Sequence, residues 1–119
     1  MFETNVTSVA AATRLFAPLL IAAKGTIVLT GSLASVAPQP GSAIYNATKA
    51  ALSMYARTLR VELKPLGVKV VHVMTAAVAT KMVDSRIEFP PDSVYRPIAA
   101  KMNKGWEELD NSAIIADEW

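Results

Sequence analysis

The chain has 119 residues, of which 52% are hydrophobic and 18% charged, and its net charge is +2. This length suits one domain with a real hydrophobic core, and no two Lys or Arg residues are adjacent, so nothing favours a nucleic-acid interface. The absence of cysteine excludes disulfides and thiolate chemistry, and a single histidine without clustered acids predicts no metal site.

One apolar run invites a membrane interpretation. Residues Leu15 to Ala23 are apolar apart from Pro18, but this run is too short to span a bilayer. Glu3 and Arg14 precede it and no basic n-region exists, so the pattern is not that of a secretory signal. We therefore expect a cytoplasmic protein without a transmembrane segment.

Hydrophobic periodicity predicts alternating helices and strands over the first two thirds of the chain. Gly25 stands directly beyond the first helical pattern, and Pro65 and Gly67 end the second. The mostly apolar second strand is expected to be buried on both faces. In chain order the elements are a helix over Met1–Ala23, a strand over Thr26–Thr30, a helix over Ala43–Leu63 and a strand over Val68–Met74.

The pattern weakens after Thr80. Residues 81–87 favour a short helix, Phe89 to Asp92 a break, and a last helix starts at Ser93 or Pro97 and runs to about Leu109. Alternating elements predict an α/β fold with a doubly wound parallel sheet. Two strands are too few for a stable open sheet, so we expect residues 1–119 to be one partial domain, the second half of a larger one. Residues 1–82 would be its catalytic core and 83–119 a substrate loop and tail.

Candidate chemistry centres on Tyr45 and Lys49. They lie four residues apart in the second predicted helix and project from one face, one turn apart. A phenol alone is a poor acid–base catalyst at neutral pH, and a neighbouring ammonium group favours its phenolate form. Ser32 follows the first predicted strand. Ligands of open α/β sheets bind beyond the carboxyl ends of the strands, where a serine hydroxyl would hold a substrate carbonyl.

Each of these residues also has an ordinary structural interpretation. A tyrosine and a lysine at the start of an amphipathic helix are common surface residues, and a serine after a strand is common in turns. The combination is more specific than its parts. It comprises the apolar strand, Gly31-Ser32, a step of thirteen residues to Tyr45, and the run Tyr-Asn-Ala-Thr-Lys-Ala-Ala-Leu.

This combination resembles the active-site segment of the short-chain dehydrogenase/reductase family. The resemblance implies a Rossmann-like fold and an oxidoreductase that reduces a carbonyl to an alcohol. It implies that Ser32 orients the carbonyl, that Tyr45 donates the proton, and that Lys49 assists the tyrosine and binds the nicotinamide ribose. Asn5, in the run Phe-Glu-Thr-Asn-Val-Thr-Ser, matches the family's catalytic asparagine, which holds a water linked to the lysine. A tolerated polar residue inside a helix is the alternative for Asn5.

The same resemblance extends past the second strand. It implies that the Val78 backbone and the Thr80 hydroxyl contact the nicotinamide carboxamide. Ala76 stands where the family usually has glycine, so a methyl group lies where the backbone normally approaches the cofactor. Thr80 as the N-cap of a following helix is an equally good interpretation.

Within the family, Val70 to Met82 and the later run Pro-Pro-Asp-Ser-Val-Tyr-Arg-Pro-Ile are similar to fungal NADPH-dependent reductases of 1-acyldihydroxyacetone phosphate. That similarity implies NADPH as cofactor, a lipid-like small-molecule substrate, and a peripheral position at the endoplasmic reticulum or lipid droplets. Four apolar residues would suit a lid over an acyl chain, and core packing explains them equally well: Met82, Val83, Tyr95 and Met102.

The family holds the dinucleotide pyrophosphate with a glycine-rich turn, and the five glycines of this chain form no such cluster. Two functions therefore stay open. In one, the chain belongs to a homo-oligomeric carbonyl reductase. In the other, it is a truncated, non-catalytic fragment that acts only by associating its helices with a full-length partner. The helix residues expected to mediate that association are Ala47, Ala51, Met54 and Leu59.

Overall fold

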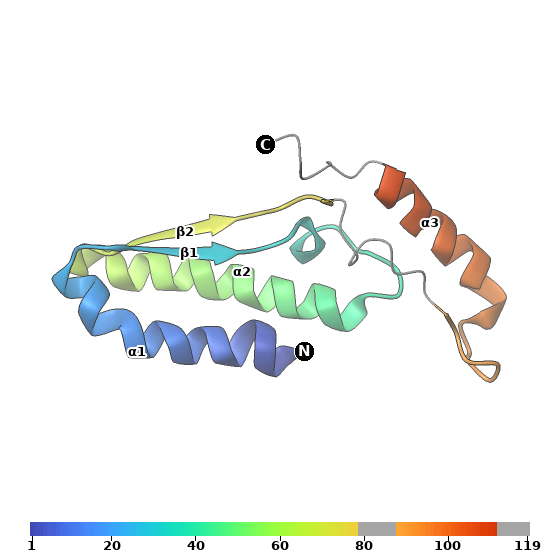
Figure 1. The fold of residues 1–119 in the computed structure, drawn as a ribbon, viewed down its shortest axis with the longest axis horizontal. Coiled ribbons are helices and arrows are strands. Elements are labelled where there is room, and N and C mark those ends of the chain that lie inside the picture. The colour runs from blue at the N-terminus through green and yellow to red at the C-terminus, as the bar shows by residue number, and fades with distance from the viewer. Residues whose placement is uncertain (79–87, 112–119) are drawn as a thin grey trace. The chain divides into compact units, whose positions relative to one another are not determined.

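The computed structural model describes residues 1–78 and 88–111 of the chain, which form parts of two compact units, Met1–Thr75 and Ala76–Trp119. Figure 1 shows the first unit as two neighbouring strands accompanied by two long helices. In the described part of the second unit there is one long helix, and the predicted helix over residues 81–87 lies outside the described residues. The first unit carries most of the predicted site.

One continuous helix opens the chain, as predicted. It consists of a π-helical turn, η1 (Glu3–Thr7), followed by α1 (Ser8–Ala22). By length and composition, the 20-residue helix Glu3–Ala22 could cross a membrane. The sequence analysis considered only the shorter apolar run Leu15 to Ala23 and therefore did not predict this. Only 6% of this helix is buried, and three partly buried residues of it pack against the core of the first unit: Val9, Leu20 and Ile21.

A Schellman motif ends α1. The N–H of Gly25 donates to the carbonyl of Leu20 at 2.9 Å, and the N–H of Lys24 donates to that of Ile21 at 3.3 Å. The left-handed residue of the motif is Lys24, with φ of 50°, rather than the predicted stop residue Gly25. The Lys24 amino group then donates to the carbonyl of Leu66 at 3.1 Å, so the end of α1 is joined to the turn before the second strand.

The sheet of the first unit is a parallel pair. Strand β1 (Thr26–Thr30) has the predicted bounds, and β2 (Lys69–Val73) is one residue shorter at each end than predicted. Thr26 pairs with Lys69 and Thr30 with Val73. Between the strands run η2 (Leu33–Ser35), α2 (Ala43–Leu63) and η3 (Lys64–Leu66). This order of helices around a parallel pair confirms the predicted α/β class.

The core lies between the strands and α2. Leu29 of β1 and Val70 of β2 point to the face that the helices cover, because residues of both α1 and α2 pack in the same cluster. The buried members of the cluster are Leu29, Leu52, Ala56, Leu59, Leu63, Val68 and Val70. Leu59 is only 7% exposed, so its predicted role in binding a partner is wrong: the periodicity of α2 places it in the core.

The opposite face of the sheet is open. Val28 is 61% exposed, and Val71 and Val73 are each 42% exposed. The prediction that the second strand is buried on both faces is therefore wrong for this chain. Parallel strands normally carry helices on both faces, and here the packed helices α1 and α2 share one.

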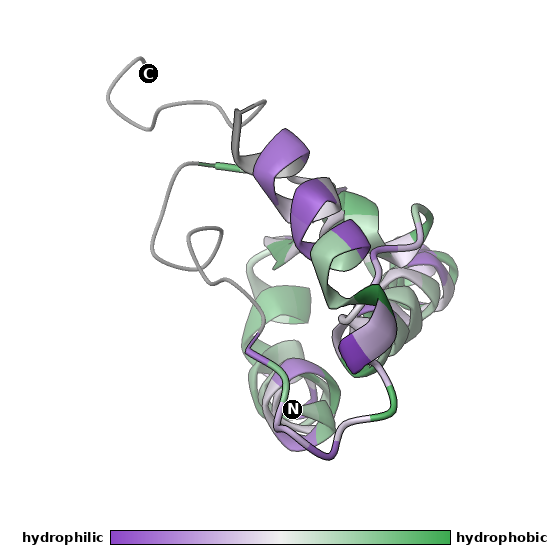
Figure 2. Cartoon of the chain, turned by 90° about the vertical axis from the view of Figure 1, so that its right-hand side faces the viewer, coloured by the Kyte–Doolittle hydropathy of each residue, from purple (hydrophilic) through white to green (hydrophobic). Residues whose placement is uncertain are grey.

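In the second unit, η4 (Arg96–Ile98) leads into α3 (Ala99–Asn111), close to the predicted last helix. Figure 2 shows that the last turns of α3, before the grey trace, are hydrophilic. Before η4, the rings of Phe89 and Tyr95 lie 6.0 Å apart. Of the four residues suggested as a lid, Met102 is buried, Tyr95 is 54% exposed, and Met82 and Val83 lie outside the described residues.

Candidate active site

Ser32 lies two residues beyond the carboxyl end of β1. Its backbone is extended, and its Oγ accepts a hydrogen bond of 3.1 Å from the N–H of Ala34, which caps η2. A hydroxyl that accepts one bond still has its own proton to donate. The segments after the two strands are also joined, since the Leu33 N–H donates to the Thr75 carbonyl at 3.0 Å and the Thr75 hydroxyl to the Gly31 carbonyl at 3.1 Å. Ser32 is thus held on a fixed turn.

The first turns of α2 bring Lys49 and Tyr45 to this same end of β1. The amino group of Lys49 donates a hydrogen bond of 3.1 Å to the carbonyl of Thr30, the last residue of β1. That amino group also lies 5.8 Å from the centre of the Tyr45 ring, within the range of a cation–π contact. The helix α2 contacts η2 as well, the element that Ser32 caps. The structure therefore gathers Ser32, Tyr45 and Lys49 at the carboxyl end of one strand.

Asn5 joins the site from the π-helical turn. Its side-chain amide donates a hydrogen bond of 3.0 Å to the hydroxyl of Thr48, the residue next to Lys49. A π-helical turn is rare and is frequent at functional sites, where the wider turn redirects a side chain. The resemblance matched Asn5 to a catalytic asparagine, and the structure joins its side chain to Thr48, the sequence neighbour of Lys49.

Two predicted cofactor contacts lie outside the part of the first unit that carries this site. Val78 lies in the second compact unit, and Thr80 lies outside the described residues. Their roles stay predictions. The described residues contain no group of three or more His, Cys, Asp or Glu side chains that could hold a metal ion.

His72 and Gly31 make a close contact beneath the site. The Nε2 atom of His72 is buried and has no hydrogen-bond partner among the described residues. A methyl group added at Gly31 would overlap this nitrogen, so only glycine fits beside the ring. The sequence predicted His72 as a sheet or core residue and gave no sign of this contact.

Thr48 is a candidate site residue that the sequence analysis did not single out. Its side chain is fully buried, and no other polar residue in the described part of the chain is buried. The sequence did contain a sign of this burial. Thr48 lies at the helical spacing of the buried stripe of α2, which continues with Leu52, Ala56, Leu59 and Leu63. A hydroxyl among apolar positions of a stripe requires hydrogen-bond partners, and here it has two.

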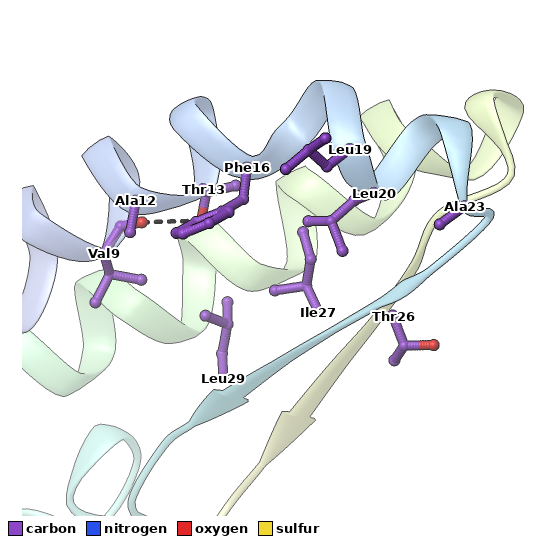
Figure 3. Close-up of a pocket in the computed structure, with 10 residues that line it drawn as sticks. All are labelled: Val9, Ala12, Thr13, Phe16, Leu19, Leu20, Ala23, Thr26, Ile27 and Leu29. Atoms are coloured by element: carbon purple, nitrogen blue, oxygen red, sulfur yellow. Dashed lines mark hydrogen bonds between the residues drawn. The ribbon is translucent and has the colours of Figure 1, made fainter.

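An apolar groove runs beside the site along α1 and β1. Side chains of α1 and β1 line this groove (Figure 3), which has a volume of about 510 Å³. The Thr13 hydroxyl in its wall donates to the carbonyl of Val9 at 2.8 Å and is therefore already bonded within α1. The wall consists of Val9, Ala12, Thr13, Phe16, Leu19, Leu20, Ala23, Thr26, Ile27 and Leu29. Such a lining suits apolar groups and offers nothing for a phosphate or a reacting carbonyl.

Comparison with known proteins identifies the family of this chain. Residues 1–90 match the short chain dehydrogenase family. A short-chain dehydrogenase of Penicillium ochrochloron, ptmH, is 46% identical over 122 aligned positions, which cover 99% of this chain and 45% of that protein. The NADPH-dependent 1-acyldihydroxyacetone phosphate reductase of Saccharomyces cerevisiae is 46% identical over 94 positions, 79% of this chain and 31% of that protein.

A solved structure gives the same answer for the fold. A short-chain dehydrogenase from Streptomyces avermitilis superposes with a TM-score of 0.74 and 26% sequence identity. The superposition covers 97% of this chain and 42% of that one. The chain thus spans less than half the length of the curated relatives it matches, and the parallel pair β1–β2 corresponds to part of a larger Rossmann-type sheet.

Proposed function

The chain belongs to the short-chain dehydrogenase family, and we propose that it supplies the catalytic half of an NADPH-dependent reductase that converts a carbonyl to an alcohol. The observation that carries this proposal is the position of Lys49, hydrogen-bonded to the end of β1 and 5.8 Å from the Tyr45 ring. Lys49 thus brings a positive charge beside the tyrosine that we propose as the proton donor.

In the proposed reaction the hydroxyl of Tyr45 gives its proton to the carbonyl oxygen of the substrate. The Ser32 hydroxyl donates a hydrogen bond to the same oxygen and holds it in place. Bound NADPH supplies the hydride that the carbonyl carbon takes up. Proton and hydride together convert the carbonyl to an alcohol.

The residues of this chain fit one end of that cofactor. Lys49 carries an ammonium beside the Tyr45 ring and so has hydrogen-bond donors for a ribose hydroxyl. None of the five glycines stands within two positions of another, so the chain has no glycine-rich turn for the pyrophosphate. We therefore propose that this chain binds the nicotinamide ribose and that a segment outside these 119 residues binds the phosphates.

We further propose a long-chain acyl ketone such as 1-acyldihydroxyacetone phosphate as substrate, handled at the cytoplasmic surface of a membrane or lipid droplet. Two relatives named as reductases of that compound, from Saccharomyces cerevisiae and Schizosaccharomyces pombe, support it at 46% and 41% identity. The test compares NADPH oxidation with 1-acyldihydroxyacetone phosphate and with dihydroxyacetone phosphate, which lacks the acyl chain. Equal turnover of the two would contradict an acyl-specific site.

The catalytic proposal is tested by Tyr45→Phe in the natural polypeptide that contains this chain. We expect turnover to fall by about 10²-fold or more, with NADPH affinity almost unchanged, because the ring stays and only the proton donor is lost. Tyr55→Phe is the matched control, since Tyr55 lies on the same helix, ten residues away, and packs against the core. A Tyr45→Phe enzyme with most of its activity would remove Tyr45 from this role.

The second candidate, a non-catalytic fragment that binds a full-length partner through its helices, is favoured by a separate observation. Met54 on α2 is 61% exposed, and on α1 Leu15 is 72% and Leu19 67% exposed. Apolar side chains at this exposure on neighbouring helices suit a helix-to-helix contact. Under this alternative the chain would co-purify with a full-length relative, and Met54→Glu would abolish the association. A monomeric chain that does not bind such a relative would exclude it.

A further inference from the structure

Thr48 occupies an unusual position for a hydroxyl group. Its side chain belongs to α2 and is fully buried. In the sequence, Thr48 follows Tyr45 by three residues and directly precedes Lys49. A valine would fit the same space and would match the apolar stripe of the helix. The burial of a hydroxyl at this point is unfavourable unless it is hydrogen-bonded, so its partners indicate its role.

The Thr48 hydroxyl makes two hydrogen bonds in opposite senses. It accepts from the Asn5 side-chain amide at 3.0 Å and donates its own proton to the backbone carbonyl of Tyr45 at 2.7 Å. A hydroxyl that accepts and donates at once polarises both bonds. The bond between Asn5 and Thr48 therefore joins residues 43 positions apart in the sequence.

The link also joins the π-helical turn η1 to the first turns of α2. Asn5 is the central residue of the π-helical turn Glu3–Thr7, and its own N–H donates to the carbonyl of Met1 at 2.9 Å. Tyr45 lies in the first turn of α2, and its carbonyl accepts the proton of the Thr48 hydroxyl three residues further along the helix. A buried bond at this point fixes the rotation of the first turns of α2 relative to η1.

We propose that Thr48 is a positioning residue that fixes the orientation of Tyr45 and Lys49 through its bonds to Asn5 and to the Tyr45 carbonyl. It touches no reacting atom. The proposal rests on the proposed function, because it assigns Thr48 a role in placing the tyrosine and lysine that reduce the carbonyl. It differs from a purely structural role in that loss of the hydroxyl would affect turnover more than fold stability.

The test compares Thr48→Val, which keeps the shape and removes the hydroxyl, with Thr48→Ser, which keeps the hydroxyl, in the natural polypeptide. We expect kcat to fall by about 10-fold to 100-fold in Thr48→Val with KM nearly unchanged, and to recover largely in Thr48→Ser. Thr58→Val is the control, since Thr58 lies on the exposed side of the same helix. An unaltered kcat in Thr48→Val, or an equal loss in Thr48→Ser, overturns the proposal.

A second pair of variants covers the case in which Thr48→Val does not fold. Thr48→Ala and Thr48→Ser differ only in the hydroxyl oxygen, and the proposal requires the serine enzyme to be about tenfold faster or more. An independent measurement follows the Asn5 side-chain amide protons by NMR. Their protection from exchange should persist in Thr48→Ser and disappear in Thr48→Ala. Equal protection in both variants contradicts the hydrogen-bond link.

The outcome also separates this proposal from the proposed function. If Tyr45→Phe is active, the catalytic assignment fails and Thr48 has nothing to position. If Tyr45→Phe is inactive while Thr48→Val turns over like the unmodified protein, the catalytic assignment holds and the positioning role fails.

Discussion

The amino group of Lys49 lies 5.8 Å from the centre of the Tyr45 ring while it donates a 3.1 Å hydrogen bond to the Thr30 carbonyl. The lysine is therefore anchored at two places, on the end of β1 and beside the phenol. The backbone contact restricts the flexible side chain and keeps the positive charge beside the tyrosine. This relationship makes Lys49 the residue whose loss should most directly affect the proposed acid–base chemistry.

The first prediction concerns that charge. In Lys49→Met the side chain keeps its length, but the ammonium beside Tyr45 is lost, so we expect turnover to fall by about 10²-fold or more. Steady-state NADPH oxidation by the natural polypeptide measures it. Lys69→Met, which changes an exposed lysine on β2, is the matched control and should leave turnover unchanged. Equal activity of both variants would rule out a role for the Lys49 charge.

The second prediction concerns the floor of the site. In Gly31→Ala the new methyl group would overlap His72 Nε2 and would lie 3.0 Å from the Val73 carbonyl oxygen. We expect the variant to lose about 1–3 kcal/mol in its free energy of unfolding, because the ring has to move. The effect should be smaller in a His72→Ala background, since the ring is then absent. Denaturant unfolding of the four proteins measures the coupling, and an equal loss in both backgrounds would contradict the contact.

The third prediction concerns the turn before β2. Gly67 has φ of 81°, and a methyl group there would meet the Lys24 side chain. Gly67→Ala should therefore lower the free energy of unfolding by about 1–2 kcal/mol. Gly105→Ala is the opposite case, because Gly105 lies within α3 and a methyl group there meets no atom within 4 Å. There alanine should stabilise the helix by about 0.5–1 kcal/mol. Thermal unfolding distinguishes the two signs.

Local sequence signals predicted much of the first unit. The bounds of β1 and α2 follow from β-branched clustering and from helical periodicity, which act within one element. Ser32, Tyr45 and Lys49 were singled out because their spacing puts them at the end of one strand and on one helix face. Bonds between residues far apart in the sequence leave no such spacing. The contact of Asn5 with Thr48 and that of Gly31 with His72 could therefore be found only in the structure.

The errors have a common physical cause. Leu59 was offered as a contact for a partner, yet it completes the core stripe of α2. The second strand was expected to be covered on both faces, yet Val71 and Val73 are exposed. Burial depends on which other elements are present, and apolar character in one segment does not reveal how many neighbours it has.

The fourth prediction uses the open sheet face. Val28 is 61% exposed here, so Val28→Ala should cost the 119-residue chain no more than about 0.5 kcal/mol in its free energy of unfolding. Leu29→Ala is the control on the opposite face, where a 7% exposed leucine should cost about 2–5 kcal/mol. If a longer polypeptide covers the sheet face that carries Val28, Val71 and Val73, Val28→Ala should lower the free energy of unfolding more in that polypeptide than in this chain. Denaturant unfolding of both lengths tests it, and an equal small cost would mean that this face stays open.

The last prediction concerns the cofactor. The 119-residue chain should bind NADPH negligibly, because it holds residues for the nicotinamide ribose but no glycine-rich turn for the pyrophosphate. Most of the polar contacts of a dinucleotide are made by its phosphates and its adenosine, so a site for one end gives little affinity. Isothermal titration calorimetry of the chain with NADPH is the measurement, and nicotinamide mononucleotide is the control ligand because it lacks the adenosine half. Saturable binding of NADPH in the micromolar range would contradict the division of the cofactor site that we propose.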